Sequence, residues 1–272
     1  MQPDYVEYYR PGQLEEAVEL FQRLKQENKA PMYWSGGTEI LTLGRLNIDT
    51  PRSIIDIKGI PETMVLEKTA KILTIGSDVP LTTLEEDNRF PLLTAISSGI
   101  ADRTARNKIT IGGNICGKIF YREAVLPFLL ADSHVLIADS QGRKEVPINE
   151  LTLEEGQLLV SIRTDVAFLQ LPFMAQKIRM QWETGYPLIT GAAINASGQI
   201  RTAFSGLCPF PFRSSAMENE LNRSEVSIEN RIERALEHVP EPILEDIEGS
   251  KEYRLFVLRN LLMDFLLELE GA

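Results

Sequence analysis

Apolar and polar positions along this chain follow two different periods, and the helical period is strongest near the start. Residues 14–25 repeat apolar side chains every three to four positions directly after Pro11-Gly12, which predicts an amphipathic helix. Residues 251–268 are apolar on nearly every side, yet Arg254 and Asp264 interrupt them, so we expect a core or subunit-packing helix rather than a membrane span. Further helices are predicted at residues 81–85, 91–96, 122–131, 214–222 and 227–237.

Short β-prone runs lie between these helices. They predict strands at residues 53–57, 72–76, 135–138, 157–163, 174–179, 188–195 and 202–206. The sequence Ala196-Ser197-Gly198-Gln199 separates the last two runs and is typical of a hairpin turn. Because helices and strands alternate without a regular βαβ period, we predict an α+β fold rather than a doubly wound sheet. The pattern changes near Thr164-Asp165, where we place a domain boundary.

Two glycine bends carry the candidate chemistry. Ser35-Gly36-Gly37-Thr38 follows an extended run at residues 30–34, and Gly112-Gly113-Asn114 follows another at residues 108–111. A diphosphate can approach main-chain N–H groups closely only where no Cβ intervenes and φ can be positive. Thr38 and Asn114 could add side-chain donors to the same ligand. Two such bends favour a dinucleotide site, while plain tight turns remain the alternative.

Neither bend matches the best-known phosphate loops. Both lack the Lys-Ser/Thr pair of a Walker loop. Both also lack the third glycine that opens the helix of a Rossmann fingerprint, and the flanking pattern does not predict that strand–helix context. On the bends alone, the kind of nucleotide site therefore stays open.

Composition narrows the function classes. With 272 residues, 43% of them hydrophobic, the chain can bury a substantial core and form two domains. A net charge of -11 argues against a nucleic-acid or anionic-membrane surface, because both reward clustered Lys and Arg. The first residues lack the basic start and apolar stretch of a leader, and no run is long and uncharged enough to span a bilayer, so we expect a cytoplasmic protein.

Cysteine and histidine are too scarce for most catalytic or metal sites. Cys116 and Cys208 cannot supply the ligands of a structural zinc or an iron–sulfur cluster, and we expect Cys116 to be a small buried side chain. His134 is expected on a strand and His238 at a helix C-terminus, so neither indicates a Ser-His-Asp set or a metal site. If the protein is an enzyme, its reactivity therefore comes from a cofactor.

Several ordered motifs together resemble one known family over nearly the whole chain. They are Tyr9-Arg10-Pro11, Trp34-Ser35-Gly36-Gly37-Thr38-Glu39, Ile54-Ile55-Asp56-Ile57, residues 106–115 from Arg106 to Ile115, residues 205–213 from Ser205 to Arg213, and Gly249-Ser250-Lys251-Glu252-Tyr253-Arg254. In this order and spacing the chain resembles the flavin-binding subunit of molybdenum hydroxylases, the xanthine dehydrogenase and carbon monoxide dehydrogenase family.

The resemblance implies a fold, a domain plan and a cofactor. It implies an α+β fold with a PCMH-type FAD-binding domain at residues 1–165, in subdomains of about 1–57 and 58–165. A C-terminal flavoprotein domain of antiparallel sheet plus helix bundle is implied at residues 166–272. The residues implied to bind FAD are Tyr33, Trp34, Ser35, Gly36, Gly37, Thr38, Glu39, Ile40, Ile100, Thr110, Gly112, Gly113, Asn114, Glu123, Leu159, Lys177 and Tyr186.

Four of these residues have individual roles in the family pattern. Ile100 is implied to pack on the cofactor and Leu159 to lie beside the isoalloxazine ring. Lys177 would place a cation near the flavin, where it could stabilise a reduced anionic ring. Tyr186 lies where some members have an aromatic gate; an exposed turn aromatic before Pro187 is the alternative.

The chain departs from the family pattern at two places. Where many members have an aspartate three residues before the helix proline, here Pro127, this chain has Ala124. We expect the neighbouring Glu123 to make the polar contact instead; a solvated glutamate at a helix start is the alternative. The basic run that often follows Lys177 is reduced to Arg179 and then Met180-Gln181. The sequence therefore does not determine the reduction potential of the flavin or the identity of the electron acceptor.

By the same resemblance, the protein is expected to be an FAD-dependent oxidoreductase subunit. It would take electrons from the iron–sulfur clusters of a partner and pass them through FAD to NAD or another acceptor. The implied partners are a molybdopterin-binding large subunit and a small 2Fe-2S subunit, in a complex resembling xanthine dehydrogenase that acts on hypoxanthine or xanthine.

Two alternatives remain on sequence grounds. A stand-alone flavin reductase on the same fold, similar to the UDP-N-acetylmuramate dehydrogenase group, would need a proton donor, and few acids lie near the bends. A cofactor-free assembly subunit is conceivable because residues 118–123 are altered.

Overall fold

The computed structural model describes residues 6–48, 50–179 and 185–270. Its α-helices are α1 (Leu14–Gln26), α2 (Thr38–Arg45), α3 (Pro61–Met64), α4 (Leu81–Asp87), α5 (Pro91–Ser98), α6 (Arg103–Arg106), α7 (Ile111–Cys116), α8 (Leu126–Leu130), α9 (Ser215–Leu221), α10 (Ile228–Leu236) and α11 (Lys251–Leu269). The strands are β1 (Glu7–Tyr9), β2 (Pro31–Trp34), β3 (Ser53–Asp56), β4 (Leu66–Lys68), β5 (Ile72–Gly76), β6 (His134–Asp139), β7 (Gly142–Pro147), β8 (Leu158–Asp165), β9 (Phe173–Ile178), β10 (Ile189–Ala196), β11 (Gln199–Ser205) and β12 (Phe212–Arg213). Four short 3-10 turns complete it: η1 (Ile57–Gly59), η2 (Glu123–Val125), η3 (Ile148–Glu150) and η4 (Val166–Phe168).

The chain forms two compact units, each with its own core. The first contains residues 1–84, 103–117 and 133–165, and the second contains residues 85–102, 118–132 and 166–272. This division differs from the continuous domain expected at residues 1–165. The physical reason is packing, because α5 contacts β9 and α8 contacts β10 and β11 of the second unit.

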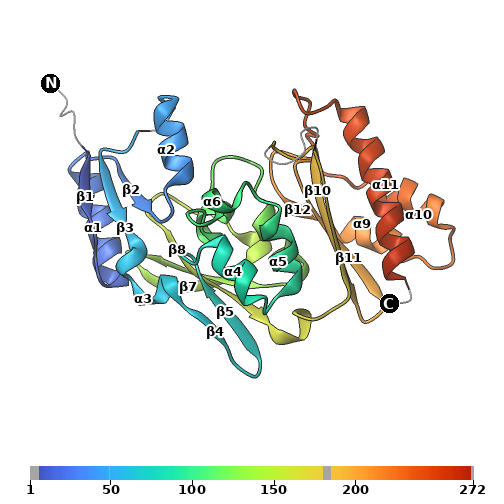
Figure 1. The fold of residues 1–272 in the computed structure, drawn as a ribbon, viewed down its shortest axis with the longest axis horizontal. Coiled ribbons are helices and arrows are strands. Elements are labelled where there is room, and N and C mark those ends of the chain that lie inside the picture. Colours follow the sequence, from blue (N-terminus) through green and yellow to red (C-terminus); the bar gives the residue numbers. More distant parts are fainter. Residues whose placement is uncertain (1–5, 49, 180–184, 271–272) are drawn as a thin grey trace. The chain divides into compact units, whose positions relative to one another are not determined.

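The first unit begins with a three-stranded parallel sheet in the order β1-β3-β2. Helix α1 packs on β2 and β3 with its predicted apolar stripe, in which Leu14, Val18 and Phe21 are buried. Since β2 and β3 are parallel neighbours, α2 is the crossover of a βαβ unit (Figure 1). From the sequence pattern we expected no strand–helix context at the first glycine bend. That expectation was wrong, because the bend connects β2 to α2.

A five-stranded antiparallel sheet in the order β4-β5-β8-β6-β7 completes the first unit. Leu158 and Val160 of β8 and Ala138 of β6 join the core that α1 forms on the parallel sheet. The two sheets of this unit therefore share one hydrophobic core.

The second unit is built on a four-stranded antiparallel sheet in the order β12-β11-β10-β9. Figure 1 shows α9, α10 and α11 gathered on one face of this sheet. A Cβ on Gly191 of β10 would meet Phe265 of α11, whereas the hydroxyl of the preceding residue, Thr190, donates to Glu123 of η2. Because successive strand residues point to opposite faces, the segment with η2 lies on the other face from α11.

The α+β fold is confirmed, and most predicted elements agree with the structure within a few residues. Two differ. Residues 108–111 do not form a strand; Thr110 makes only an isolated bridge with Pro80, and α7 begins at Ile111. The helix expected at residues 122–131 consists of η2 followed by the short helix α8.

Candidate functional site

The first glycine bend connects β2 to α2. Gly37 is the N-cap of α2 and adopts a φ of 72°, which favours glycine, and a Cβ on it would also overlap the ring of Trp34. A Cβ on Gly36 would overlap the carbonyl oxygen of Lys108, and it would lie 2.8 Å from the carbonyl carbon. The two bends therefore meet backbone to backbone, at a distance only glycine permits.

The first bend presents open hydrogen-bond donors. Among the described residues, the amide N–H groups of Gly36, Gly37 and Thr38 have no acceptor; the first amide of this segment that is bonded in the helical pattern is that of Leu41, to the carbonyl of Gly37 at 3.0 Å. They lie at the N-terminus of α2, where the helix dipole also favours an anion. This arrangement suits the oxygens of a diphosphate.

The second bend is a helix start rather than a turn. Thr110 is the N-cap of α7, and its Oγ1 accepts from the Gly113 amide at 3.2 Å. The amides of Ile111 and Gly112 donate to the carbonyls of Val79 at 3.0 Å and Ser77 at 2.8 Å. These amides are therefore already bonded within the protein, unlike those of the first bend, so the two bends do not play the equal parts that their sequences suggested.

Close packing explains the glycine at position 112. A Cβ there would lie 2.5 Å from Cβ of Ser77, so Gly112 lets α7 approach the segment that follows β5. Cys116, at the end of α7, is exposed, and the expectation of a buried side chain was wrong. Asn114 is half-buried on the same helix, and its amide donates to the Thr110 carbonyl.

A chain of polar groups ties the two bends together. The hydroxyl of Ser35 donates to Oδ1 of Asp78 and lies 2.7 Å from Oγ1 of Thr110. Nζ of Lys58 donates to the Ser35 carbonyl at 3.0 Å and pairs with Asp56 at 2.9 Å. Lys58 thus holds the peptide group at the start of the first bend, with Asp56 as its counter-ion.

The sequence analysis missed Asp78 and Lys58. Asp78 comes two residues after β5, and Lys58 comes two residues after β3. Polar residues directly after a buried strand are a signal for a site, because strand ends commonly carry ligand contacts. That signal could have singled out both residues.

Asp78 is 2% exposed, and its Oδ2 has no hydrogen-bond partner among the described residues. Burial raises the pKa of the Asp78 carboxyl above its ordinary value of 3.8, although the hydrogen bond from Ser35 opposes the change. An aspartate with a raised pKa favours the folded state most when it is protonated, so part of that stability is lost as the pH rises.

We therefore expect Asp78→Asn to change how stability depends on pH. The unfolded carboxyl ionises first as the pH rises above about 3.8, so the free energy of unfolding of the wild type should fall relative to that of the variant. The fall is at most ~1.4 kcal/mol per pH unit and ends once the pH exceeds the folded pKa. Urea denaturation at a series of pH values measures it. A difference that stays constant with pH would show that Asp78 titrates as in the unfolded chain.

The remaining predicted residues of the first unit lie around the first bend or in the sheets. The ring of Tyr33 stacks on Phe21 with centroids 4.8 Å apart, and its hydroxyl donates to the Gly156 carbonyl at 3.1 Å. Burial raises the pKa of Tyr33. Ile40 is half-buried on α2, and a Cβ on Gly117 would lie 2.7 Å from Oε2 of Glu39. Leu159 is buried on β8.

The other four predicted residues belong to the second unit, where two of them form a buried ion pair. Nζ of Lys177 lies 2.7 Å from Oε1 of Glu123 and donates to the Gly99 carbonyl at 2.8 Å. The Thr190 hydroxyl donates to the other Glu123 oxygen at 2.6 Å. Burial lowers the pKa of Lys177, and the charge of Glu123 opposes that change. Glu123 is therefore a buried counter-ion and not a solvated residue at a helix start.

Ile100 and Tyr186 differ in exposure. Ile100 is buried next to Gly99, whereas Tyr186 is 50% exposed. The Tyr186 ring stacks on that of Tyr121, with centroids 4.5 Å apart. Burial raises the pKa of Tyr121 to about 12. Met180 and Gln181, where the basic run is thinned, lie outside the described residues.

The residues that the structure describes lack two further kinds of feature. They contain no group of three or more His, Cys, Asp or Glu side chains arranged to hold a metal ion. Within the same residues, none of the helices combines the length and the apolar character needed to cross a membrane.

Comparisons with known proteins identify the family of this chain. Residues 4–165 match the family model described as the FAD binding domain in molybdopterin dehydrogenase. Over 99% of its length the chain is 26% identical to the xanthine dehydrogenase FAD-binding subunit of Escherichia coli O157:H7, covering 97% of that protein. It is 25% identical to the carbon monoxide dehydrogenase medium chain of Hydrogenophaga pseudoflava, with 93% of each chain covered.

Solved structures show the same fold. Carbon monoxide dehydrogenase from Hydrogenophaga pseudoflava, in a form lacking the Mo-pyranopterin moiety, has a chain 24% identical to this one, with a TM-score of 0.87 and 98% of each chain covered. Quinoline 2-oxidoreductase from Pseudomonas putida 86 has a chain 21% identical, with a TM-score of 0.83, covering 100% of this chain and 99% of that one. The family match and the full-length relatives together establish that this chain belongs to the FAD-binding domain family of molybdopterin dehydrogenases, as an FAD-binding oxidoreductase subunit of the molybdenum hydroxylase kind.

Proposed function

We propose that the amides of Gly36, Gly37 and Thr38 hold the FAD diphosphate. The observation that carries this proposal is their open state at the N-terminus of α2. Lys58 binds the Ser35 carbonyl at the start of this bend, but Asp56 already pairs with it, so the open amides rather than Lys58 carry the proposal. The residues thus fit the cofactor, because the bend offers open donors where no side chain obstructs the backbone.

The second bend has a supporting role in this proposal. Thr110, Gly112 and Gly113 hold α7 against the Ser77-Asp78 segment, and the hydrogen bonds of Ser35 join that segment to the first bend. The second bend would therefore orient the donors of the first. Asn114 would reach the ligand through its side chain, since its backbone amide is already bonded.

We further propose that Ile100, Leu159, Lys177 and Tyr186 contact the flavin portion, as the family pattern implies. Because Glu123 neutralises Lys177 within the second unit, the pair would present less positive charge to a reduced flavin than a lone lysine. Glu123 would then act on the flavin through Lys177 as a positioning residue.

The complex that we propose contains a molybdopterin-binding large subunit and a small 2Fe-2S subunit. Bound FAD supplies the redox chemistry, accepting electrons that reach it from the partner's clusters and delivering them to NAD or another acceptor. Xanthine or hypoxanthine is the proposed substrate. The supporting observation is a full-length relative named as a xanthine dehydrogenase subunit, although relatives named for carbon monoxide, nicotine and caffeine also match.

The test has two parts. Purified chain mixed with FAD and then desalted is expected to retain about one FAD per chain, measured by its visible spectrum. A tagged chain expressed with its chromosomal neighbours is expected to capture a molybdenum subunit and a two-cluster iron–sulfur subunit, and the complex to reduce NAD with hypoxanthine. A chain that retains no flavin would favour the assembly-subunit alternative. Flavin retention without any captured partner would favour the stand-alone reductase.

A further inference from the structure

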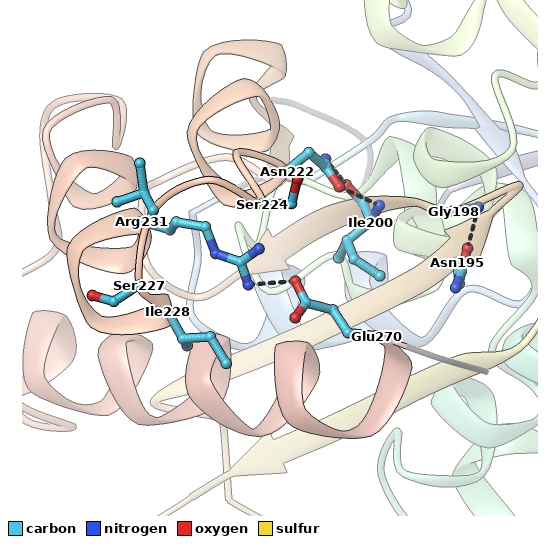
Figure 2. Close-up of a pocket in the computed structure, with 10 residues that line it drawn as sticks. Asn195, Gly198, Ile200, Asn222, Ser224, Ser227, Ile228, Arg231 and Glu270 are labelled. Carbon is cyan, nitrogen blue, oxygen red and sulfur yellow. Dashed lines mark hydrogen bonds and ion pairs between the residues drawn. The ribbon is translucent and has the colours of Figure 1, made fainter.

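A separate cavity of about 400 Å³ lies in the second unit. It opens between the N-terminus of α10, the β10–β11 hairpin and the end of α11, as Figure 2 shows. Its volume falls within the usual range of small-molecule sites. Its lining contains none of the residues predicted to bind FAD; it includes the charged side chains of Arg231 and Glu270 and the apolar side chains of Ile200, Val226 and Ile228.

The cavity contains a buried cation with unused donors. Arg231 is 3% exposed, and Figure 2 shows its guanidinium extending from α10 toward Glu270. One nitrogen donates to the Glu270 carboxylate, and within the described part of the chain the Nε has no acceptor. A guanidinium carries five N–H donors, and buried donors are normally bonded. Arg231 therefore has the capacity to bind a further acceptor.

The neighbouring asparagine side chains, Asn195 and Asn222, do not serve as acceptors for the unused donors of Arg231, because they bond backbone groups of the surrounding fold. The side chain of Asn222 bonds both backbone groups of Ile200, each at 2.8 Å. The side chain of Asn195 bonds the Gly198 amide at 2.7 Å and the Leu269 carbonyl at 2.9 Å. The two side chains hold the hairpin and the end of α11 in place around Arg231.

The electrostatic potential in the cavity and its apolar lining indicate the kind of ligand that it would bind. The N-terminus of α10, a nine-residue helix capped by Ser227, faces the cavity and adds positive potential to that of Arg231. Ile200, Val226 and Ile228 supply apolar surface. An inorganic ion would leave these apolar walls unused, whereas a carboxylate on an apolar body would contact both parts of the lining.

Glu270 shows how such a ligand would bind. Its carboxylate already occupies one donor of Arg231, so the site accepts a carboxylate at that place. The Glu270 side chain is 37% exposed at the C-cap of α11, and it can turn to water when displaced. We propose that this cavity binds a small organic carboxylate, which replaces Glu270 on the guanidinium of Arg231.

Benzoate is the probe for the test, with inorganic phosphate and benzylamine as comparison ligands, each titrated into the purified full chain and followed by calorimetry. Benzoate is expected to bind, phosphate to bind at least tenfold more weakly, and benzylamine not to bind. Glu270→Gln should tighten benzoate binding about fivefold, because it removes the competing carboxylate. Arg231→Lys should weaken it roughly tenfold, because lysine lacks the planar fork of donors.

Glu268→Gln is the matched control, since it removes the same charge from the exposed side of α11 and should leave benzoate affinity unchanged. If Arg231→Lys unfolds the protein, the Glu270→Gln variant decides the question alone. No benzoate binding by Glu270→Gln, equal binding of phosphate, or the same tightening in Glu268→Gln would each overturn the proposal.

Discussion

Gly36→Ala is expected to weaken FAD binding roughly 100-fold, because the added methyl would overlap the Lys108 carbonyl and push the bend away from its support. A loss of affinity of about 100-fold corresponds to losing about two charge-assisted hydrogen bonds from the backbone amides. The same overlap should lower the free energy of unfolding by about 1–3 kcal/mol. FAD affinity is measured by quenching of flavin fluorescence, and stability by urea denaturation.

Gly12→Ala serves as the control for this substitution. A Cβ on Gly12 would meet no atom within 4 Å, so both flavin affinity and stability should stay near the wild-type values. If Gly36→Ala bound FAD as tightly as the wild type, the two bends would not need their close approach, and the proposed diphosphate site would be wrong.

Glu123→Gln is expected to lower the free energy of unfolding by about 3–5 kcal/mol, because it leaves Lys177 buried without its counter-charge. Losing Glu123 should also lower the pKa of Lys177 further, since burial and the nearby charge of Arg179 would then act on it without opposition. A lysine with a lowered pKa binds fewer protons in the folded state than in the unfolded one. The stability of the variant should therefore rise with pH, until the pH passes the ordinary lysine value.

The double variant Glu123→Gln with Lys177→Met separates pairing from simple loss of contacts. It should be more stable than Glu123→Gln alone, because no buried charge remains unpaired. Glu233→Gln is the control, since the Glu233–Arg259 pair is half exposed and should contribute less than about 1 kcal/mol. Additive effects of the two single changes in urea denaturation would contradict the coupling.

Elements with a strong local pattern could be predicted from the sequence. The apolar stripe of α1, the alternation of β5 and the Ser197-Gly198 turn of the β10–β11 hairpin all depend on residues within a few positions of one another. Ser197 and Gly198 both have positive φ, as the turn requires. Because these signals depend only on neighbouring residues, they can be recognised in the sequence.

The start of α7 could not be predicted in the same way. Gly112 and Gly113 are poor helix formers, and the helix forms because Thr110 caps it and because Ser77 and Val79 accept its first amides. Those acceptors lie more than thirty positions earlier in the chain. Local propensity therefore indicated a turn where tertiary hydrogen bonds stabilise a helix.

For the same reason, only part of the candidate site could be predicted from the sequence. The glycines of both bends were visible in the sequence, because a close backbone approach leaves no substitute for them. Their unequal roles were not visible, since the difference lies in which amides find acceptors elsewhere in the fold. Likewise, Glu123 and Lys177 were single candidates until η2 and β9 brought them within 2.7 Å.

By itself, then, the sequence determined the helices and strands with regular patterns, the α+β class and the two glycine bends, because each depends on neighbouring residues. Only the tertiary structure decided that the first bend keeps its amides open, that Asp78 and Lys58 lie beside it, and that Arg231 is buried with donors to spare. These features arise from contacts between residues far apart in the chain, and the free energy of such contacts depends on burial, which no single segment of the sequence contains.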